Sequence, residues 1–512
     1  MVVALAFADA IFASPVPARK PKLVVGIVVD QFRYDYLVKY KSEYNSGLAR
    51  LLERGAVFTN GHQAHFPTVT AVGHATFFTG ATPSVSGIVG NDWFDRGDGK
   101  KVTSVADFKE KTLGAESREA ASPRRLLAST VGDELKASGK GGKVIGISIK
   151  DRSAILPAGH SADGAYWFDN NTGNWVSSTY YFPELPEWVR KINGGRPADK
   201  YAGAAWKPVI GGADFAPMPS EKGRKLYSQL EKSPFGNELI EEFAEQAIAA
   251  ERLGQGYGTD VLTVSFSAND YVGHEVGPDD PKVHDMCVRT DRLLGKFFQY
   301  LDSKVGMGNV LVVLTADHGV APTPEANAAR HMPGGRLEAK KIQETIEAAL
   351  TARFGEGAWI VGAASFGSLY LNEKLLQDKK LDGAEVRTVA ARAAGNISRI
   401  SRVYTKDQLL GGLGLQDEIS RRVARGFHAA RGADLFIIPD AYWFYSEAAG
   451  GTTHGSPYGY DSHVPIIFMG GGVKHGSYHR TVAVNDIAPT LAALLEIETP
   501  SGSEGRIQDE IF

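Results

Sequence analysis

The chain of 512 residues is longer than one hydrophobic core usually supports, so a large domain with insertions, or two domains, is expected. Hydrophobic residues make up 43% and charged residues 22%, which excludes a disordered, collagen-like or coiled-coil protein. The formal net charge is −3 and no long basic run is present, so no nucleic-acid-binding surface is predicted.

The first residues have features of an export signal. Residues 2–13 form an apolar stretch, and the small residues and prolines that follow suit cleavage after Ala18. Against this interpretation, Asp9 interrupts the stretch and no basic segment precedes it. We interpret residues 1–20 as a signal peptide or a disordered N-terminus and expect a periplasmic or secreted protein. No later apolar run reaches the roughly 18 residues that cross a bilayer, so no membrane span is predicted.

Apolar, β-branched runs alternate with helical periodicity along the chain. The first run, residues 23–29 (LVVGIVV), ends at Asp30, and a helical pattern follows over residues 35–53. Uninterrupted apolar runs of this kind are typical of strands that are buried on both faces. The predicted fold class is therefore α/β, with a mostly parallel central sheet between helices. Its later elements are expected as strands at 144–149, 261–267, 309–315 and 464–469 and a closing helix at 486–495.

Two segments depart from this alternation. Residues 161–235 are rich in Trp, Tyr, Pro and Gly and are predicted to be a loop-rich insertion. Residues 321–455 are predicted to be a smaller α/β insertion that caps the core. Its expected elements are helices at 339–354 and 384–394 and strands at 368–371 and 435–438. The remaining residues, 21–160, 236–320 and 456–512, are expected to form one discontinuous catalytic core.

Aspartate and histidine side chains lie at the ends of the predicted strands, where open α/β sheets bind ligands. Three aspartates and three histidines without nearby cysteine suit zinc or a similar borderline metal. A single strand-ending aspartate is equally well explained as a helix N-cap. The candidate ligands are Asp30, Asp270, His274, Asp317, His318 and His463.

The sequence gives weaker evidence for the roles of three further residues. His454, in the segment GGTTHGSP, is either an alternative ligand to His463 or a group behind the ligands; His463 is favoured because it directly precedes a core strand. His74 is interpreted as a helix-packing residue. Cys287, the one cysteine, excludes an internal disulfide and is interpreted as a buried structural thiol.

A candidate anion site follows the first strand. In the segment HFPTVTAVGHATFFTG a helix is predicted to open at Thr70, whose hydroxyl would lie at the positive end of the helix dipole. A plain N-capping threonine explains the same pattern. Asn91 offers an amide in a later turn. Lys150 and Arg152 project from one face of a strand end, which suits either a phosphate clamp or a solvated strand end.

Taken together, these motifs resemble the alkaline phosphatase superfamily, and the chain is most similar to the threonine-nucleophile bacterial alkaline phosphatases of the PafA/PhoK type. The resemblance extends from residue 22 to the C-terminus, and the insertions contribute least to it. It rests on Asp30, PTVTAVGHATFFTG, Asn91, Lys150-Asp151-Arg152, Asp270-x-x-x-His274, Thr-Ala-Asp317-His318-Gly, Asp-Ser-His463-Val-Pro and the closing NDIAPTL at 485–491.

The resemblance implies a metal-dependent enzyme that hydrolyses phosphate monoesters through a covalent phosphothreonine. The implied ligands are Asp270, His274 and His463 for one zinc ion, and Asp30, Asp317 and His318 for the other. Thr70 would be the nucleophile and would bind metal between them. Asn91, Lys150 and Arg152 would bind the remaining phosphoryl oxygens. A structural calcium ion is also implied, without identifiable ligands.

Other functions compete with this one. A phosphodiesterase or nucleotide pyrophosphatase of the same superfamily would share the threonine and the metal ligands. The Lys150/Arg152 pair disfavours it, because a diester carries an ester group where the cations would bind oxygen. A sulfatase would need a cysteine or serine two residues before proline, with arginine following, and Cys287 lacks these neighbours. A non-catalytic binding protein on the same fold would be expected to have lost several ligands. The sequence indicates neither the oligomeric state nor the natural substrate.

Overall fold

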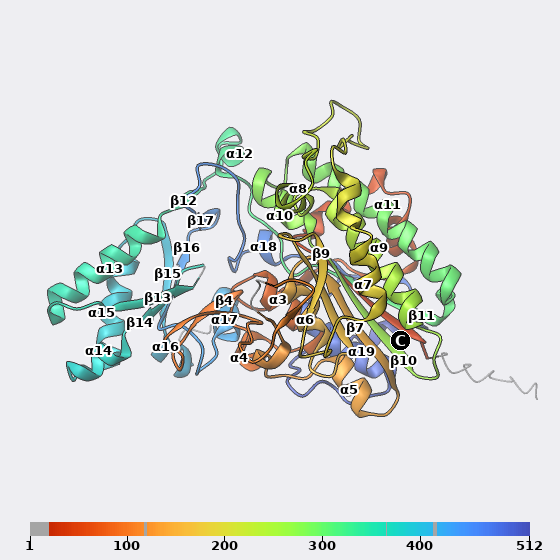
Figure 1. Ribbon diagram of the computed structural model, residues 1–512. Helices are drawn as coiled ribbons and strands as arrows, with labels where there is room; N and C mark the ends of the chain where they lie inside the picture. The colour runs from red at the N-terminus through yellow and green to blue at the C-terminus, as the bar shows by residue number, and fades with distance from the viewer. Residues whose placement is uncertain (1–19, 117–119, 365, 413–416) are drawn as a thin grey trace, which may run out of the picture.

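The computed structural model describes residues 20–116, 120–364, 366–412 and 417–512 (Figure 1). Within these residues the centre is a ten-stranded sheet in the order β19-β2-β18-β11-β1-β10-β7-β8-β9-β6. Its five innermost long strands are β18 (Ile466–Gly470), β11 (Val310–Thr315), β1 (Leu23–Val29), β10 (Thr259–Phe266) and β7 (Gly141–Ser148). The last four run parallel, whereas β18 is antiparallel to β11. The predicted α/β fold class is confirmed.

The central strands are covered on both faces by helices. All seven residues of β1 are buried, as its uninterrupted apolar sequence predicts. In Figure 1 the sheet lies between α3 (Thr70–Thr79) and α6 (Asp151–Ala158) on one side and α9 (Pro234–Glu251) and α11 (Pro281–Lys304) on the other. Gly26 in β1 lets α3 approach closely, since a Cβ there would come within 2.7 Å of the Phe78 ring.

The helix expected over residues 35–53 is broken. It consists of α1 (Tyr34–Lys39), a 3₁₀ turn at Lys41–Glu43 and α2 (Gly47–Arg54). Asp291 of α11 caps the N-terminus of α2, because its Oδ1 accepts hydrogen bonds from the N–H groups of Leu48 (2.7 Å) and Ala49 (3.1 Å). A capping carboxylate 243 positions away is invisible to a local pattern.

The segment at 161–235 is less loop-like than expected. Strands β8 (Gly164–Asp169) and β9 (Asn174–Ser178) belong to the central sheet, and β8 pairs in parallel with β7. The aromatic side chains of Tyr166, Trp167 and Phe168 are buried in the core. The aromatic residues that indicated an irregular insertion therefore include sheet residues, and the predicted segment boundaries stay a prediction. The remaining short strands of this sheet are β2 (Ala56–Phe58), β6 (Thr112–Leu113) and β19 (Gly476–Tyr478).

A second, four-stranded antiparallel sheet lies beside the main one (Figure 1). Its strands, in spatial order, are β13 (Ile360–Ala364), β14 (Ser368–Leu371), β16 (Leu435–Pro439) and β15 (Ile400–Thr405). Helices α13 (Ala339–Phe354) and α15 (Gly383–Gly395) share a hydrophobic cluster with it. The bounds of α13 and β14 are those expected from the sequence, 339–354 and 368–371.

Among the described residues, no helix combines the length and the apolar character needed to cross a bilayer. The predicted signal peptide falls almost entirely on residues 1–19, which lie outside the described residues.

Candidate metal centre

Strand order explains why residues far apart in the sequence meet. β10, β1 and β11 are adjacent and parallel, so their carboxyl ends lie at one edge of the sheet. Asp30 follows β1 directly, and Asp317 comes two residues after β11. Asp270 lies in the first turn of α10 (Ala268–Val276), which opens just after β10. Three carboxylates are thereby gathered at one place.

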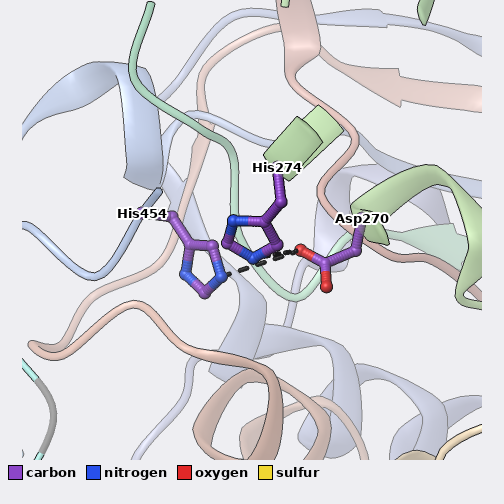
Figure 2. A group of neighbouring side chains, drawn as sticks. All are labelled: Asp270, His274 and His454. Carbon is purple, nitrogen blue, oxygen red and sulfur yellow. Dashed lines mark ion pairs between the residues drawn. The ribbon is translucent and has the colours of Figure 1, made fainter. Parts of the chain in front are cut away.

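Two groups of three side chains lie close enough to hold a metal ion each, with the ligand atoms of a group within 4.8 Å of one another. We call Asp30, Asp317 and His318 the Asp30 group, and Asp270, His274 and His454 the Asp270 group. In the second group, Nε2 of His274 and Nε2 of His454 lie 3.1 Å and 3.7 Å from Oδ1 of Asp270 (Figure 2). The rings of His318 and His454 stack at 3.4 Å between centroids, so the two groups are immediate neighbours.

The structure places His463, the favoured candidate ligand, in neither group. Its ring is stacked between Tyr34 and His62, with 4.5 Å and 4.7 Å between centroids, and its Nε2 is 3.0 Å from the carbonyl oxygen of Thr59. His454 completes the Asp270 group instead. Proximity to a core strand was a poor guide, because the position along the chain does not fix the direction of the side chain.

The glycines on either side of His454 were a sequence signal that this loop has an unusual backbone. Gly451 and Gly455 flank it with φ of +72° and +106°, conformations that other residues rarely adopt. A Cβ on Gly451 would lie 2.4 Å from the carbonyl oxygen of His274. The glycines thus bring this loop against α10, where His454 reaches Asp270.

Each histidine of the two groups is oriented by a backbone carbonyl. The Nδ1 atoms of His274, His318 and His454 lie 2.9, 2.9 and 2.8 Å from carbonyl oxygens of Thr452, Gly319 and Thr68. A carbonyl only accepts, so each Nδ1 carries a proton and each ring turns its Nε2 toward the carboxylates. Burial lowers the pKa of His318 and of His454, which favours neutral rings there. Burial acts in the same direction on His274, but the Asp270 carboxylate outweighs it and raises the pKa of His274.

The carboxylates fit bound cations. Oδ1 of Asp30 and Oδ2 of Asp317 are buried and accept no hydrogen bond. Lys150 contacts both groups, with its Nζ 2.7 Å from Oδ2 of Asp30 and 2.6 Å from Oδ2 of Asp270. Burial and the nearby carboxylate of Asp317 raise the pKa of Asp30 well above its ordinary value, although Lys150 lowers it. One buried lysine leaves three buried carboxylates undercompensated, and metal ions at the free oxygens would restore the balance.

Thr70 opens α3 beside the Asp30 group. Its Oγ1 is 3.4 Å from Nε2 of His318. Gly73, one turn later, permits this approach, because a Cβ there would be 2.3 Å from the carbonyl oxygen of Asp317. Thr68 is engaged elsewhere: its hydroxyl donates to the carbonyl oxygen of Ser456 at 2.8 Å. Of the two threonines, Thr70 is the one whose hydroxyl faces a candidate metal ligand.

Polar groups surround the start of α3. Oδ1 of Asn91 accepts the N–H of Ala71 (2.8 Å), which fixes the amide one residue from Thr70 and leaves its NH₂ group to donate to a ligand. Arg152 lies in the first turn of α6, directly after Lys150 and Asp151. Burial alone would lower the pKa of Arg152, but the nearby Asp151 and Tyr271 outweigh burial and raise it, so the guanidinium stays charged.

Two predicted structural residues are buried. His74 places Nδ1 2.8 Å from the carbonyl oxygen of Thr70 and Nε2 2.8 Å from Oγ of Ser265. It packs within α3, as expected, and its Nδ1 also lies 3.3 Å from Oδ2 of Asp317. Cys287 is a buried free thiol in α11, which confirms its predicted burial.

The chain is similar to known phosphatases and phosphodiesterases over most of its length. Residues 24–461 match the family model described as type I phosphodiesterase / nucleotide pyrophosphatase. Alkaline phosphatase PhoV of Synechococcus elongatus is 39% identical over 97% of this chain and 94% of its own length. Alkaline phosphatase PafA of Elizabethkingia meningoseptica is 37% identical over 96% and 95%. The crystal structure of PafA matches with a TM-score of 0.90 over 96% of this chain and 99% of that chain.

One solved variant of PafA bears on the residues around Thr70. It carries replacements at one threonine, one asparagine, one lysine and one arginine, and matches this chain with the same TM-score of 0.90. Thr70 and Asn91 in this chain are separated by the same interval as the replaced threonine and asparagine. The same holds for Lys150 and Arg152 and the replaced lysine and arginine.

Proposed function

Because this chain belongs to the type I phosphodiesterase / nucleotide pyrophosphatase family, we propose that it is an alkaline phosphatase, hydrolysing phosphate monoesters to inorganic phosphate and an alcohol. The observation that carries the proposal is the position of Thr70. This residue begins the buried helix α3, and its hydroxyl faces His318, next to the two adjacent groups of candidate metal ligands. The alkaline phosphatase names of relatives with 39% and 37% identity support it.

The donor set of carboxylates and imidazoles suits two zinc ions, one in each group. Bound there, they would lower the pKa of the attacking hydroxyl and neutralise charge on the leaving oxygen. The ligands proposed are Asp30, Asp317 and His318 for one ion and Asp270, His274 and His454 for the other.

The residues of the chain provide the nucleophile and position the phosphoryl group. Thr70 would attack phosphorus and become phosphorylated while the alcohol departs; water would then hydrolyse the phosphothreonine and regenerate the hydroxyl. N–H groups at the start of α3 are suited to a phosphoryl oxygen, because they point out of the positive end of the helix. Asn91, Lys150 and Arg152 would bind the oxygens that do not react. Positioning and charge stabilisation by such groups supply most of the catalysis in phosphoryl transfer.

Export to the periplasm or medium is part of the proposal. It rests on the apolar segment before Ala18 and on the alkaline phosphatase relatives.

Phosphate release tests the proposal directly. Purified protein is expected to release phosphate from an aryl phosphate monoester, to lose this activity in a strong chelator and to regain it with Zn²⁺. Elemental analysis is expected to find two transition ions per chain.

Asp317→Ala should release the ion of the Asp30 group and stop turnover, since that carboxylate and Thr70 serve the same ion. Active protein without any transition metal would refute the metal mechanism.

The family name makes a phosphodiesterase the second candidate, and Arg152 separates the two. A monoester dianion presents one more charged oxygen than a diester does. Arg152→Ala is therefore expected to lower kcat/KM for a monoester by about ten- to a hundredfold, from a charge-assisted contact of about 1.5–3 kcal/mol. The loss for a diester should be much smaller, so the ratio of the two activities should narrow.

Lys150→Ala serves as the comparison for that experiment. Lys150 contacts Asp30 and Asp270 in addition to its proposed role at a phosphoryl oxygen. Its removal is therefore expected to reduce both activities through the metal ligands, and the monoester activity further. Measuring both substrates with both variants is decisive. An unchanged ratio of the two activities in Arg152→Ala would contradict the role of Arg152. It would also remove this argument against a phosphodiesterase.

A further inference from the structure

Gln31 touches both metal-ligand groups. Its backbone N–H donates to Oδ1 of Asp317 at 3.1 Å, and its side-chain Nε2 donates to Oδ1 of Asp270 at 2.6 Å. It also directly follows Asp30 in the chain. One residue therefore bonds to a ligand of each group and is covalently joined to a third.

The oxygen that Gln31 contacts is the one that faces the histidines. Oδ1 of Asp270 is the atom nearest to Nε2 of His274 (3.1 Å) and of His454 (3.7 Å), whereas Oδ2 of Asp270 is held by Lys150. Gln31 and Lys150 thus hold the two oxygens of one carboxylate from different sides. The carboxylate cannot rotate without breaking one of these contacts.

The fold is shaped around this side chain. Gln31 has a φ of +60°, a left-handed conformation that is uncommon for residues other than glycine, and the side chain is buried. Its Oε1 fills the space beside Gly273 of α10, where a Cβ would lie only 1.8 Å from it. A strained backbone and a matching glycine on the neighbouring helix both serve to aim one amide at Asp270.

We propose that Gln31 is a positioning residue that holds the Asp270 carboxylate in register with Asp317, and so sets the geometry of the two metal ions relative to each other. The inference rests on the metal centre of the proposed function. A neutral amide suits this position: it donates to Asp270 without adding charge between two anionic groups.

Gln31→Met tests the role of the side chain alone. Methionine has a similar length and burial but no donor, and the backbone N–H to Asp317 remains. The ion of the Asp270 group is expected to bind about ten- to a hundredfold more weakly, the usual cost of losing a group that orients a ligand. Competition with a chelator of known affinity, followed by elemental analysis, measures this without turnover. The absorption spectrum of the Co²⁺-loaded protein should change as well.

Gln63→Met is the matched control. Gln63 is also a buried amide, and it donates to the carbonyl oxygen of Ala316 at 3.0 Å rather than to a ligand carboxylate. Its loss should lower the thermal stability of the metal-free protein and leave both metal affinities within about threefold of wild type, since no ligand loses a partner. Gln31→Asn is a second variant that tolerates the left-handed backbone, yet its shorter amide cannot span the distance to Asp270. It should resemble Gln31→Met.

The results distinguish this inference from the proposed function. Unchanged metal affinities in both Gln31 variants, or an equal weakening in Gln63→Met, would overturn the positioning role and leave the phosphatase proposal intact. Wild-type protein that binds no transition ion would overturn both. The ion weakened in Gln31→Met should be the ion that is absent when His454 is replaced by alanine.

Discussion

Replacing Thr70 by alanine is expected to reduce turnover of a phosphate monoester by at least about a thousandfold, because it removes the hydroxyl proposed as the nucleophile beside His318. Thr68, two residues earlier, donates its hydroxyl to the backbone of Ser456. Steady-state assays and mass spectrometry of acid-quenched protein measure the effect. Wild-type protein should yield a phosphopeptide over residues 65–80, and the variant should not.

Two substitutions control for damage to the helix. Thr70→Ser keeps the hydroxyl that attacks phosphorus, so activity should fall by less than about tenfold. The loss of one buried methyl group should cost about 0.8 kcal/mol of folding stability. Thr68→Val removes the neighbouring hydroxyl at nearly constant volume and should still form the phosphoenzyme. Near-normal turnover in Thr70→Ala, or a phosphate found on Thr68, would contradict the assignment of the nucleophile.

Replacing His454 by alanine is expected to remove one of the two metal ions and to lower kcat by more than about a hundredfold. The reason is geometric: its Nδ1 is held by the carbonyl oxygen of Thr68, so that Nε2 faces Oδ1 of Asp270. With His454 gone, Asp270 and His274 alone would have to hold the ion, and two protein ligands bind zinc weakly. Elemental analysis after dialysis gives the ion count.

His463→Ala is the matched experiment, since it removes the histidine that sequence position favoured. Its ring stacks on Tyr34 and His62 outside both groups. Its replacement is expected to destabilise the protein by about 1 kcal/mol through lost aromatic contact and to leave two ions bound. Loss of an ion from His463→Ala, with retention in His454→Ala, would overturn the geometry of the Asp270 group.

Much of the central sheet and of the ligand set follows from the sequence by itself. Residues 23–29 form β1 as predicted, because a strand buried on both faces requires an uninterrupted apolar run and little else. Asp30, Asp270 and Asp317 were placed together for a related reason. Each comes at or just after a strand end, and the backbone alone carries it to the shared edge of a parallel sheet.

Other features depended on contacts with elements that a local sequence pattern does not include. The break before α2 requires Asp291 of another helix, and the aromatic segment that forms β8 requires an exposed edge of β7 to pair with. Local periodicity describes which face of an element is apolar. It does not show which carboxylate will cap a helix or which strand edge will be open for pairing, so neither feature could be predicted from it.

The choice between His454 and His463 shows the same limit within the site. Two histidines only nine positions apart point to different places, one onto Asp270 and the other between aromatic rings. The carbonyl oxygen of Thr68 orients His454, and Asp461 holds the next part of the loop through Ser456, at 2.6 Å between its Oδ2 and the serine hydroxyl. Strand ends position the aspartates through the backbone, whereas these histidines and Gln31 are aimed by hydrogen bonds and packing that exist only once the chain has folded.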